Sequence, residues 1–169
     1  MTFSQLSCQA QRSSDRVVVA SAGKIISLDP AKASTFGSLQ LLKALGDPLY
    51  SLGLDGGLKP KLAAGQPQIS EDGLTVSIPL RKGVLFHDGT PFNAEAMAFS
   101  FRRFMRIGTM NYLLGDRIKA VEFPEPYLFV LKLNRSSTSL NGLLTSINLT
   151  PVSPSAYSQH KNKFLNKSF

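Results

Sequence analysis

Hydrophobic and polar residues alternate with changing periods along the chain, and each period predicts an element of secondary structure. The β-branched run RVVVAS at 16–21 predicts a buried strand. Between Ser34 and Leu45, apolar residues recur at helical spacing, which predicts an amphipathic helix terminated by Gly46 and Pro48. This part of the chain is therefore expected to contribute one strand and one helix.

Two later segments have the period of strands. The segment 74–80 alternates apolar and polar residues after the turn pair Asp72-Gly73, so it is predicted to be a strand with one buried face. Pro79 cannot donate to a ladder and indicates an edge strand or a strand end. Further on, AVEFPEPYLFVLKLN at 120–134 predicts two strands joined at 124–126.

A second helix is predicted from Ala94 to about Arg106, with Asn93 as its N-cap. One side of this helix is apolar and is expected to face the core. The other side is expected to be solvated and basic, and it carries Phe99, Arg102, Arg103 and Arg106. With a short helical piece within 135–149 and a basic helix near the C-terminus, the fold class is α/β or α+β with a mixed sheet.

The composition is that of a chain that folds around a core. Of 169 residues, 43% are hydrophobic and 18% are charged, as is usual for globular proteins. The 19 lysines and arginines exceed the 11 acidic residues and give a net charge of +8, which favours acidic partners in general. Because the basic residues are dispersed, a solvated basic surface is the simpler interpretation.

Cys8 is the single cysteine, which excludes an intrachain disulfide and a multi-cysteine metal site. It lies in a polar lead at 1–15 that is predicted to be flexible. The letters LSC before a polar tether are typical of the end of a bacterial lipoprotein signal, although Gln5 stands where that signal has Leu, Val or Ile. Cys8 is thus a lipidation candidate, and a chance cysteine in a frayed terminus is the alternative. The apolar runs are too short to span a bilayer.

The chain offers little that is typical of catalysis. His87 and Asp88 are adjacent in HDGTPFNAEA, but adjacent residues in a turn usually point apart, so we interpret Asp88 as a cap of its own turn. The other histidine, His160, lies far away in the sequence. No G-x-S-x-G word and no phosphate-binding glycine loop occur, so we expect a protein that is not an enzyme and that holds no cofactor or metal.

Five words in a fixed order resemble the extracytoplasmic solute-binding proteins of family 5, the peptide-binding and nickel-binding components of ABC importers. The third word is the most specific because it joins a strand, a turn and a capped helix. The words are SLDPAKAS at 27–34, LGDPLYSLGLDGGLKPKLA at 45–63, SEDGLTVSIPLRKGVLFHDGTPFNAEAMAFSFRRF at 70–104, MNYLLGDRIKAVE at 110–122 and TPVSPSAY at 150–157.

The resemblance implies a type II periplasmic-binding-protein fold that is incomplete. Residues 16–46 would be the first strand and helix of lobe one, and 47–150 the smaller inserted domain with a largely antiparallel sheet. Residues 151–169 would begin the return to lobe one. The family's GTGPY word and second lobe are absent, so we expect a truncated or split gene product.

The resemblance also implies where a solute would bind. The family's backbone contacts to peptide fall on Ala33, Ser34, Thr35 and Phe36, and a tyrosine contact of some members falls on Met110, with Tyr112 close by. Plain packing of these residues is the alternative.

We therefore expect a solute-binding component, or its N-terminal fragment, that binds oligopeptides or similar solutes for an ABC permease. It would work in the periplasm or cell envelope and touch the membrane only through a lipid anchor. Two rivals stay open. One is a basic adaptor for nucleic acid or an acidic partner, for which Phe99 among the three arginines of the 94–106 helix is the best hint. The other is a truncated remnant without function.

Overall fold

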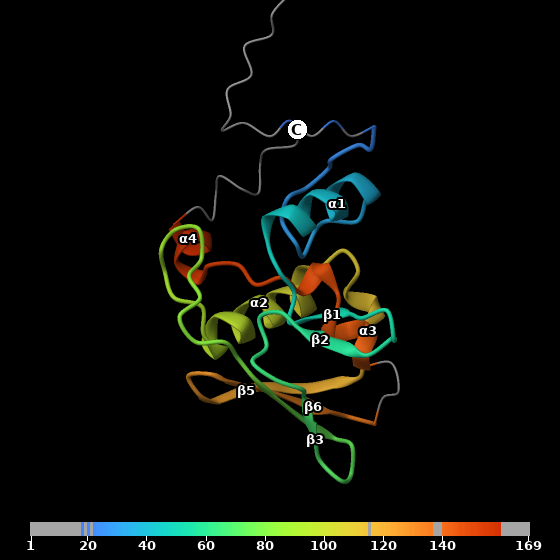
Figure 1. Ribbon diagram of the computed structural model, residues 1–169, viewed down its shortest axis with the longest axis vertical. Helices are drawn as coiled ribbons and strands as arrows, with labels where there is room; N and C mark the ends of the chain where they lie inside the picture. The colour runs from blue at the N-terminus through green and yellow to red at the C-terminus, as the bar shows by residue number, and fades with distance from the viewer. Residues whose placement is uncertain (1–17, 19, 21, 115, 137–139, 160–169) are drawn as a thin grey trace, which may run out of the picture.

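A computed structural model describes residues 18, 20, 22–114, 116–136 and 140–159 of the chain (Figure 1). The chain contains both helices and strands, which agrees with the mixed α/β class that the sequence predicts. In chain order the elements are α1 (Phe36–Leu45), β1 (Tyr50–Leu52), β2 (Leu58–Pro60), β3 (Gln68–Ile69), β4 (Thr75–Pro79), α2 (Ala94–Ile107), η1 (Asn111–Leu113), β5 (Ile118–Glu125), β6 (Leu128–Leu133), α3 (Leu140–Leu144), η2 (Ile147–Leu149) and α4 (Pro154–Gln159).

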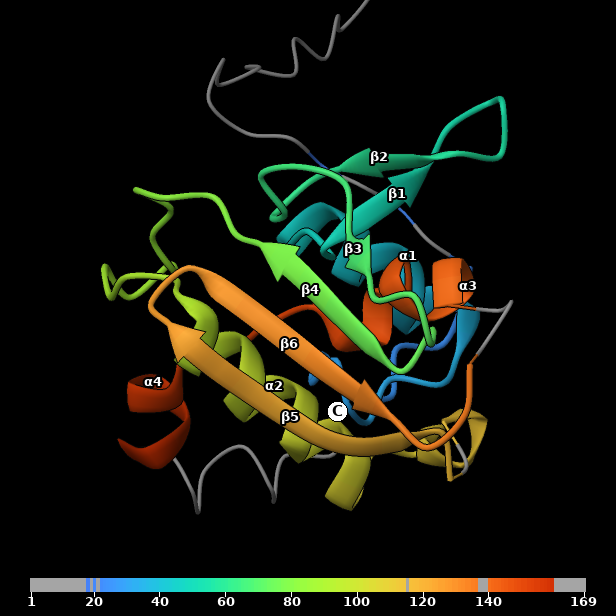
Figure 2. The ribbon, with the colours of Figure 1, turned by 90° about the horizontal axis from the view of Figure 1, so that it is seen from below.

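The main sheet has four strands in the order β3-β4-β6-β5 (Figure 2). Each strand pair within the described residues is antiparallel, so the parallel part expected of a mixed sheet is not found there. The predicted strands at 74–80 and 120–134 are confirmed as β4 and the β5–β6 hairpin. Pro79 pairs with Leu128 at the end of β4, in the interior of the sheet, so the proline marks a strand end and not an edge strand.

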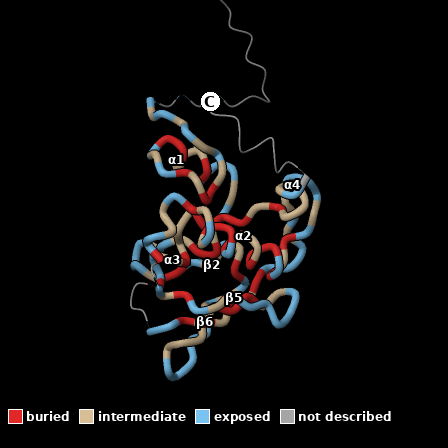
Figure 3. The backbone as a smooth tube through the Cα atoms, turned by 180° about the vertical axis from the view of Figure 1, so that it is seen from behind, coloured by how far each residue is buried: buried red, intermediate tan, exposed pale blue. Residues whose placement is uncertain are grey.

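Helix α2 lies across one face of this sheet and contacts β5 and β6 (Figure 2). The predicted apolar side of the helix is buried there, and the ring centroids of Phe101 and Phe129 are 5.7 Å apart. Each such side chain contributes about 2 kcal/mol through burial alone. The buried stretches in Figure 3 accordingly concentrate between α2 and the sheet.

The beginning of α2 is set by local chemistry. The side chain of Asn93 accepts a hydrogen bond from the Ala96 amide at 2.9 Å, as an N-cap does. Glu95 lies in the first turn, where the helix dipole favours a carboxylate. The predicted helix is confirmed, and it extends one residue beyond Arg106, to Ile107.

A separate two-stranded hairpin, β1–β2, packs beside the main sheet. Its Tyr50 is fully buried, and the Tyr50 hydroxyl donates to the carbonyl oxygen of Gly65 at 2.9 Å. Burial raises the pKa of Tyr50 to about 12, so the hydroxyl stays protonated and can serve as this donor at any physiological pH. The bond ties the hairpin to the loop that leads into β3.

Helix α1 stands at the periphery of the molecule (Figure 1). Its prediction is confirmed, with Thr35 as N-cap and Gly46 as the first residue beyond it. Gly37 allows the close approach of the preceding segment, since a Cβ there would lie 2.8 Å from the Gly23 carbonyl oxygen. Of the predicted apolar stripe only Leu42 is buried, whereas 74% of Phe36 is exposed.

The prediction of a strand at 16–21 is wrong for the two residues of this segment that the structure describes. Val18 and Ala20 are exposed and lie in no strand, and 16, 17, 19 and 21 lie outside the described residues. A strand needs a neighbour to pair its backbone groups. No strand in the described ranges pairs with this segment.

The last described segment returns to α2. The predicted short helix within 135–149 is confirmed as α3, and the predicted terminal helix begins at Pro154, while 160–169 lie outside the described residues. The Ser100 hydroxyl accepts from the Val152 amide at 2.9 Å, and the rings of Phe99 and Tyr157 meet edge to face. Residues 151–159 are therefore fastened along α2.

Candidate functional site

The loop at 29–35 begins with a turn that Asp29 organises. The Asp29 carboxylate accepts from the Ala31 amide at 3.1 Å, and the Asp29 carbonyl accepts from the amides of Lys32 and Ala33, both at 2.9 Å. Such a turn is expected of an aspartate followed by proline. It directs the chain into α1, whose N-cap is Thr35.

Arg103 of α2 anchors this turn. Its two terminal nitrogens donate to the two carboxylate oxygens of Asp29, one of them at 2.7 Å, and its side chain is only 3% exposed. The Arg103 guanidinium also donates to the Tyr157 hydroxyl at 2.9 Å and lies 4.1 Å from the centre of that ring. Burial alone would lower the pKa of Arg103, but the hydrogen bond and charge of Asp29, with a smaller contribution from Tyr157, raise it overall. The guanidinium is therefore a permanent charge.

Asn148 of η2 holds the middle of the same loop. Its Nδ2 donates to the carbonyl oxygens of Pro30 at 2.8 Å and of Ala33 at 2.7 Å. Asn148 is buried, so both bonds form away from bulk water. The loop is thus shaped from inside the molecule by a residue more than a hundred positions away.

Thr109 joins the two segments that the family resemblance assigns to solute contact, the loop before α1 and the segment of Met110 and Tyr112. The Thr109 amide donates to the Ala31 carbonyl at 2.9 Å, and the Thr109 hydroxyl donates to the Lys32 carbonyl at 3.2 Å. Met110 follows directly, partly buried against the core, and Tyr112 lies in η1 with 69% of its surface exposed. The segment that carries Met110 and Tyr112 therefore lies beside the loop that leads to Ala33.

The four loop candidates differ in exposure. Ala33 is buried, Thr35 is half-buried, and Ser34 and Phe36 are exposed. The Thr35 hydroxyl donates to the Lys24 carbonyl at 2.8 Å, so that side chain has a structural role as well. Within the described residues no hydrogen bond joins the backbone of Ser34 to another group.

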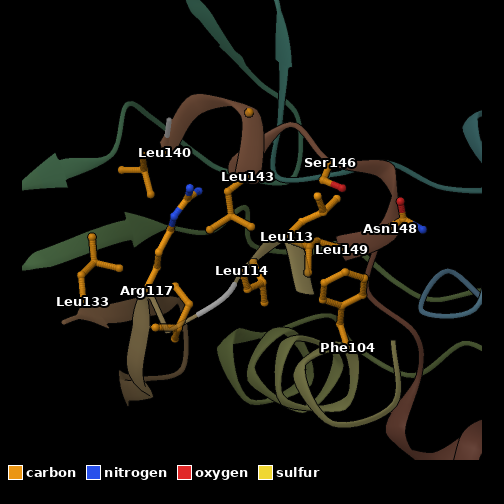
Figure 4. A pocket seen from close by; sticks show the side chains of 12 residues that line it. Phe104, Leu113, Leu114, Arg117, Leu133, Leu140, Leu143, Ser146, Asn148 and Leu149 are labelled. Carbon is orange, nitrogen blue, oxygen red and sulfur yellow. The ribbon is translucent and has the colours of Figure 1, made fainter. Parts of the chain in front are cut away.

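A cavity of about 340 Å³ adjoins this region (Figure 4). Apolar side chains form most of its wall, and Asn148 belongs both to this wall and to the support of the loop. Leu113 and Leu114 connect it to the segment of Met110 and Tyr112. The lining residues are Phe104, Leu113, Leu114, Arg117, Ile118, Leu133, Leu140, Gly142, Leu143, Ser146, Asn148 and Leu149.

His87 and Asp88 form a turn and not a reactive pair. Asp88 accepts from the amide and hydroxyl of Thr90 at 3.0 and 2.6 Å and from the Ser153 hydroxyl at 2.5 Å. Gly89, with φ 80°, supplies the left-handed residue that the turn needs. His87 is exposed, and the described residues contain no cluster of three or more groups that could hold a metal ion.

The prediction of a solvated basic face on α2 is wrong for Arg103, which is buried against Asp29. Arg102 donates to the Val121 carbonyl and lies 5.4 Å from the centre of the Phe123 ring, and Phe99 packs on Tyr157. Stacking on nucleic acid needs free aromatic and basic groups side by side. Phe99, Arg102 and Arg103 all contact other groups of the protein. The structure therefore does not support the interpretation that this face of α2 binds nucleic acid.

Sequence reasoning missed Arg103, Thr109 and Asn148 as supports of the candidate site. Arg103 lies 74 positions from Asp29, and Asn148 lies 115 positions from Ala33. Periodicity reports only local structure, so no signal in the single sequence links these pairs.

Comparisons with known proteins agree on one family. The model of the bacterial extracellular solute-binding proteins, family 5 middle, matches residues 57–168. The glutathione-binding protein GsiB of Salmonella choleraesuis (strain SC-B67) is 31% identical over 146 residues, which are 85% of this chain and 28% of GsiB.

Solved structures match the fold. Listeria monocytogenes OppA bound to peptide superposes with a TM-score of 0.76 at 23% identity, over 83% of this chain and 31% of OppA. The substrate-binding domain of an oligopeptide ABC transporter from Bacillus anthracis gives a TM-score of 0.77 at 17% identity, over 86% and 31% of the two chains. The described elements therefore match about a third of the fold of these binding proteins.

This chain spans less than a third of the length of these relatives. The family consists of binding proteins and not of enzymes, which confirms the expectation that the protein is not an enzyme. Since the family model covers well over half of the residues, the chain belongs to family 5 of the bacterial extracellular solute-binding proteins.

Proposed function

We propose that this chain forms part of the solute-binding site of an ABC importer and that the solute is a peptide or a peptide-like compound. The observation that carries the proposal is the loop at 29–35, where internal contacts hold the neighbouring carbonyls and leave the backbone of Ser34 unpaired among the described residues. The relatives support the solute class, since one binds glutathione, itself a tripeptide, and another is bound to peptide.

The mode of binding follows from backbone chemistry. An extended peptide can pair its own amide and carbonyl groups with an unpaired stretch of backbone, as in strand addition. Ser34 offers both groups at an exposed position, and Ala33, Thr35 and Phe36 flank it. Main-chain pairing would hold peptides of many sequences, and Met110 and Tyr112 would contact the solute from the adjoining segment.

We assign residues 47–150 to a smaller inserted domain and 16–46 together with 151–169 to lobe one. The support is that 22–45 and 151–159 both reach α2 from outside the main sheet, through Arg103 and Tyr157. Limited proteolysis tests the assignment: a resistant fragment of about 47–150 is expected, and preferred cleavage within the β4–β6 region would refute it.

The proposed location is the periplasm or cell envelope, with an ABC permease as partner. The family description, extracellular, supports this. Cys8, the proposed lipidation site, lies outside the described residues. None of the helices in the described ranges has the length and apolarity needed to cross a membrane.

Thermal unfolding in the presence of candidate solutes tests the function. Trialanine and glutathione at millimolar concentration are expected to raise Tm, because a ligand that binds only the folded state stabilises it by mass action. Glucose and a nickel salt are the comparison solutes. A flat response to both peptides, or a larger response to a single-stranded oligonucleotide that salt abolishes, would count against the proposal.

A further inference from the structure

We infer that Asn148 is a positioning residue for the candidate solute loop: its amide fixes the carbonyls of Pro30 and Ala33 and so presents the backbone of Ser34 to the solute. The contact between Asn148 and the loop is observed, and its effect on binding rests on the proposed function.

The geometry uses the full donor capacity of the amide. The Nδ2 group of Asn148 has two hydrogens, and they go to two carbonyl oxygens at 2.8 and 2.7 Å. Those carbonyls belong to residues three positions apart, so the pair of bonds fixes both ends of the segment between them. A serine could satisfy only one of the carbonyls, and a carboxylate could satisfy neither.

Within the described residues, Asn148 is the one hydrogen-bond donor to these two carbonyls. Arg103 and Thr109 act on other atoms, namely the Asp29 carboxylate and the carbonyls of Ala31 and Lys32. Loss of Asn148 would therefore leave the start of the turn in place. The segment that would move is the one that ends at Ala33, directly before Ser34.

The amide is carried by a packed segment. Asn148 lies in η2, which packs against both α1 and α2. Its neighbour Leu149 is buried, and the Leu149 amide donates to the Ser146 carbonyl at 3.1 Å. Figure 4 shows Asn148 at the edge of the cavity, beside Leu149 and Phe104. The packing of η2 therefore supports the direction in which Asn148 donates to the loop.

The decisive variant is Asn148→Asp, which keeps the shape of the side chain and removes both donors. Asn141→Asp is the matched control, because it makes the same chemical change at an exposed position of α3 that donates to neither carbonyl. Carbonyl-carbon NMR shifts of Pro30 and Ala33, read through the amides of Ala31 and Ser34 in the full chain, report the hydrogen bonds directly. A general loss of stability would not move these two shifts selectively.

We expect Asn148→Asp to move both carbonyl shifts upfield and Asn141→Asp to leave them in place. If the aspartate variant does not fold, Asn148→Ser keeps one donor and should move at least one of the two signals. Equal shifts in the Asn148 variant and the Asn141 control would overturn the positioning role.

Trialanine titrations of the same samples test the consequence for the solute. Asn148→Asp is expected to weaken binding at least about tenfold, which corresponds to about 1.4 kcal/mol, while Asn141→Asp binds as the wild type does. Unchanged affinity in Asn148→Asp would overturn the inference. A wild-type chain that binds no peptide would refute the proposed function, and the carbonyl shifts would still decide whether Asn148 positions the loop.

Discussion

Arg103 and Asp29, 74 positions apart in the sequence, form a bidentate ion pair. Each terminal nitrogen of the guanidinium donates to one oxygen of the carboxylate. The pair joins α2 to the turn before α1, and Tyr157 joins the same guanidinium from α4. Three segments that are far apart in the sequence therefore share one buried charge. Their relative positions, and with them the candidate site, depend on it.

Removing the arginine should be costly. Arg103→Met leaves the carboxylate of Asp29 mostly buried without its partner, and we expect a loss of about 3 kcal/mol in the free energy of unfolding. Urea denaturation measures this loss, and a cycle with Asp29→Asn isolates the pairwise part. Additive effects of the two substitutions would show that the two side chains do not interact.

Acid should weaken the turn at 87–90. The Ser153 hydroxyl and the side chain and amide of Thr90 hold the pKa of Asp88 below its usual value. A carboxylate whose pKa is lower in the folded state stabilises the protein above its unfolded pKa, about 3.9, and this contribution disappears as the pH falls through the folded pKa.

The urea midpoint of the wild type should therefore fall as the pH drops below about 4, and Asp88→Asn should make that fall less steep. The substitution should change the midpoint least at the most acidic pH, where the wild-type carboxyl is protonated too. An identical slope in both proteins would show that Asp88 has no part in acid sensitivity.

Two glycine substitutions should have opposite effects. A Cβ at Gly142 in α3 would meet no atom within 4 Å, so Gly142→Ala is expected to stabilise the fold by about 0.4–1 kcal/mol by restricting the unfolded chain. A Cβ at Gly37 would press on the Gly23 carbonyl, so Gly37→Ala should destabilise it. Calorimetric Tm values compare the pair, and a drop for Gly142→Ala would contradict the open space beside it.

Backbone pairing at Ser34 makes a prediction that side-chain binding does not. Ser34→Ala keeps the amide and should retain peptide affinity, whereas Ser34→Pro removes the amide hydrogen and should abolish it. Circular dichroism would verify that both variants fold. Loss of affinity in the alanine variant alone would assign the contact to the hydroxyl.

Local chemistry made much of the fold predictable. Asn93 as cap of α2, the Asp72-Gly73 turn and the alternation in β4 are each settled by neighbours in sequence, and all three appear as expected. The strand at Val18 failed because a strand depends on a partner that local pattern cannot supply. Arg103 was misplaced on a solvated face because helical periodicity does not reveal a distant carboxylate.

The candidate site was predictable only through the resemblance. The sequence motifs shared with the family indicated Ala33–Phe36 and Met110 with Tyr112 as contact residues. The structure brings these two segments together through Thr109. Asn148, which shapes the loop, lies in a Ser/Asn/Leu-rich stretch without distinctive spacing. Its role depends on a contact over 115 positions, and a single sequence carries no trace of that contact.

The most direct test of the peptide site is a titration of the isotope-labelled chain with trialanine, followed by amide NMR. The proposed function predicts saturable shifts of the amides of Ser34, Thr35, Phe36 and Tyr112, and NMR detects them even when binding is weak. Amides that stay unmoved at this loop, or shifts confined to the neighbourhood of Arg102 and Arg106, would contradict it.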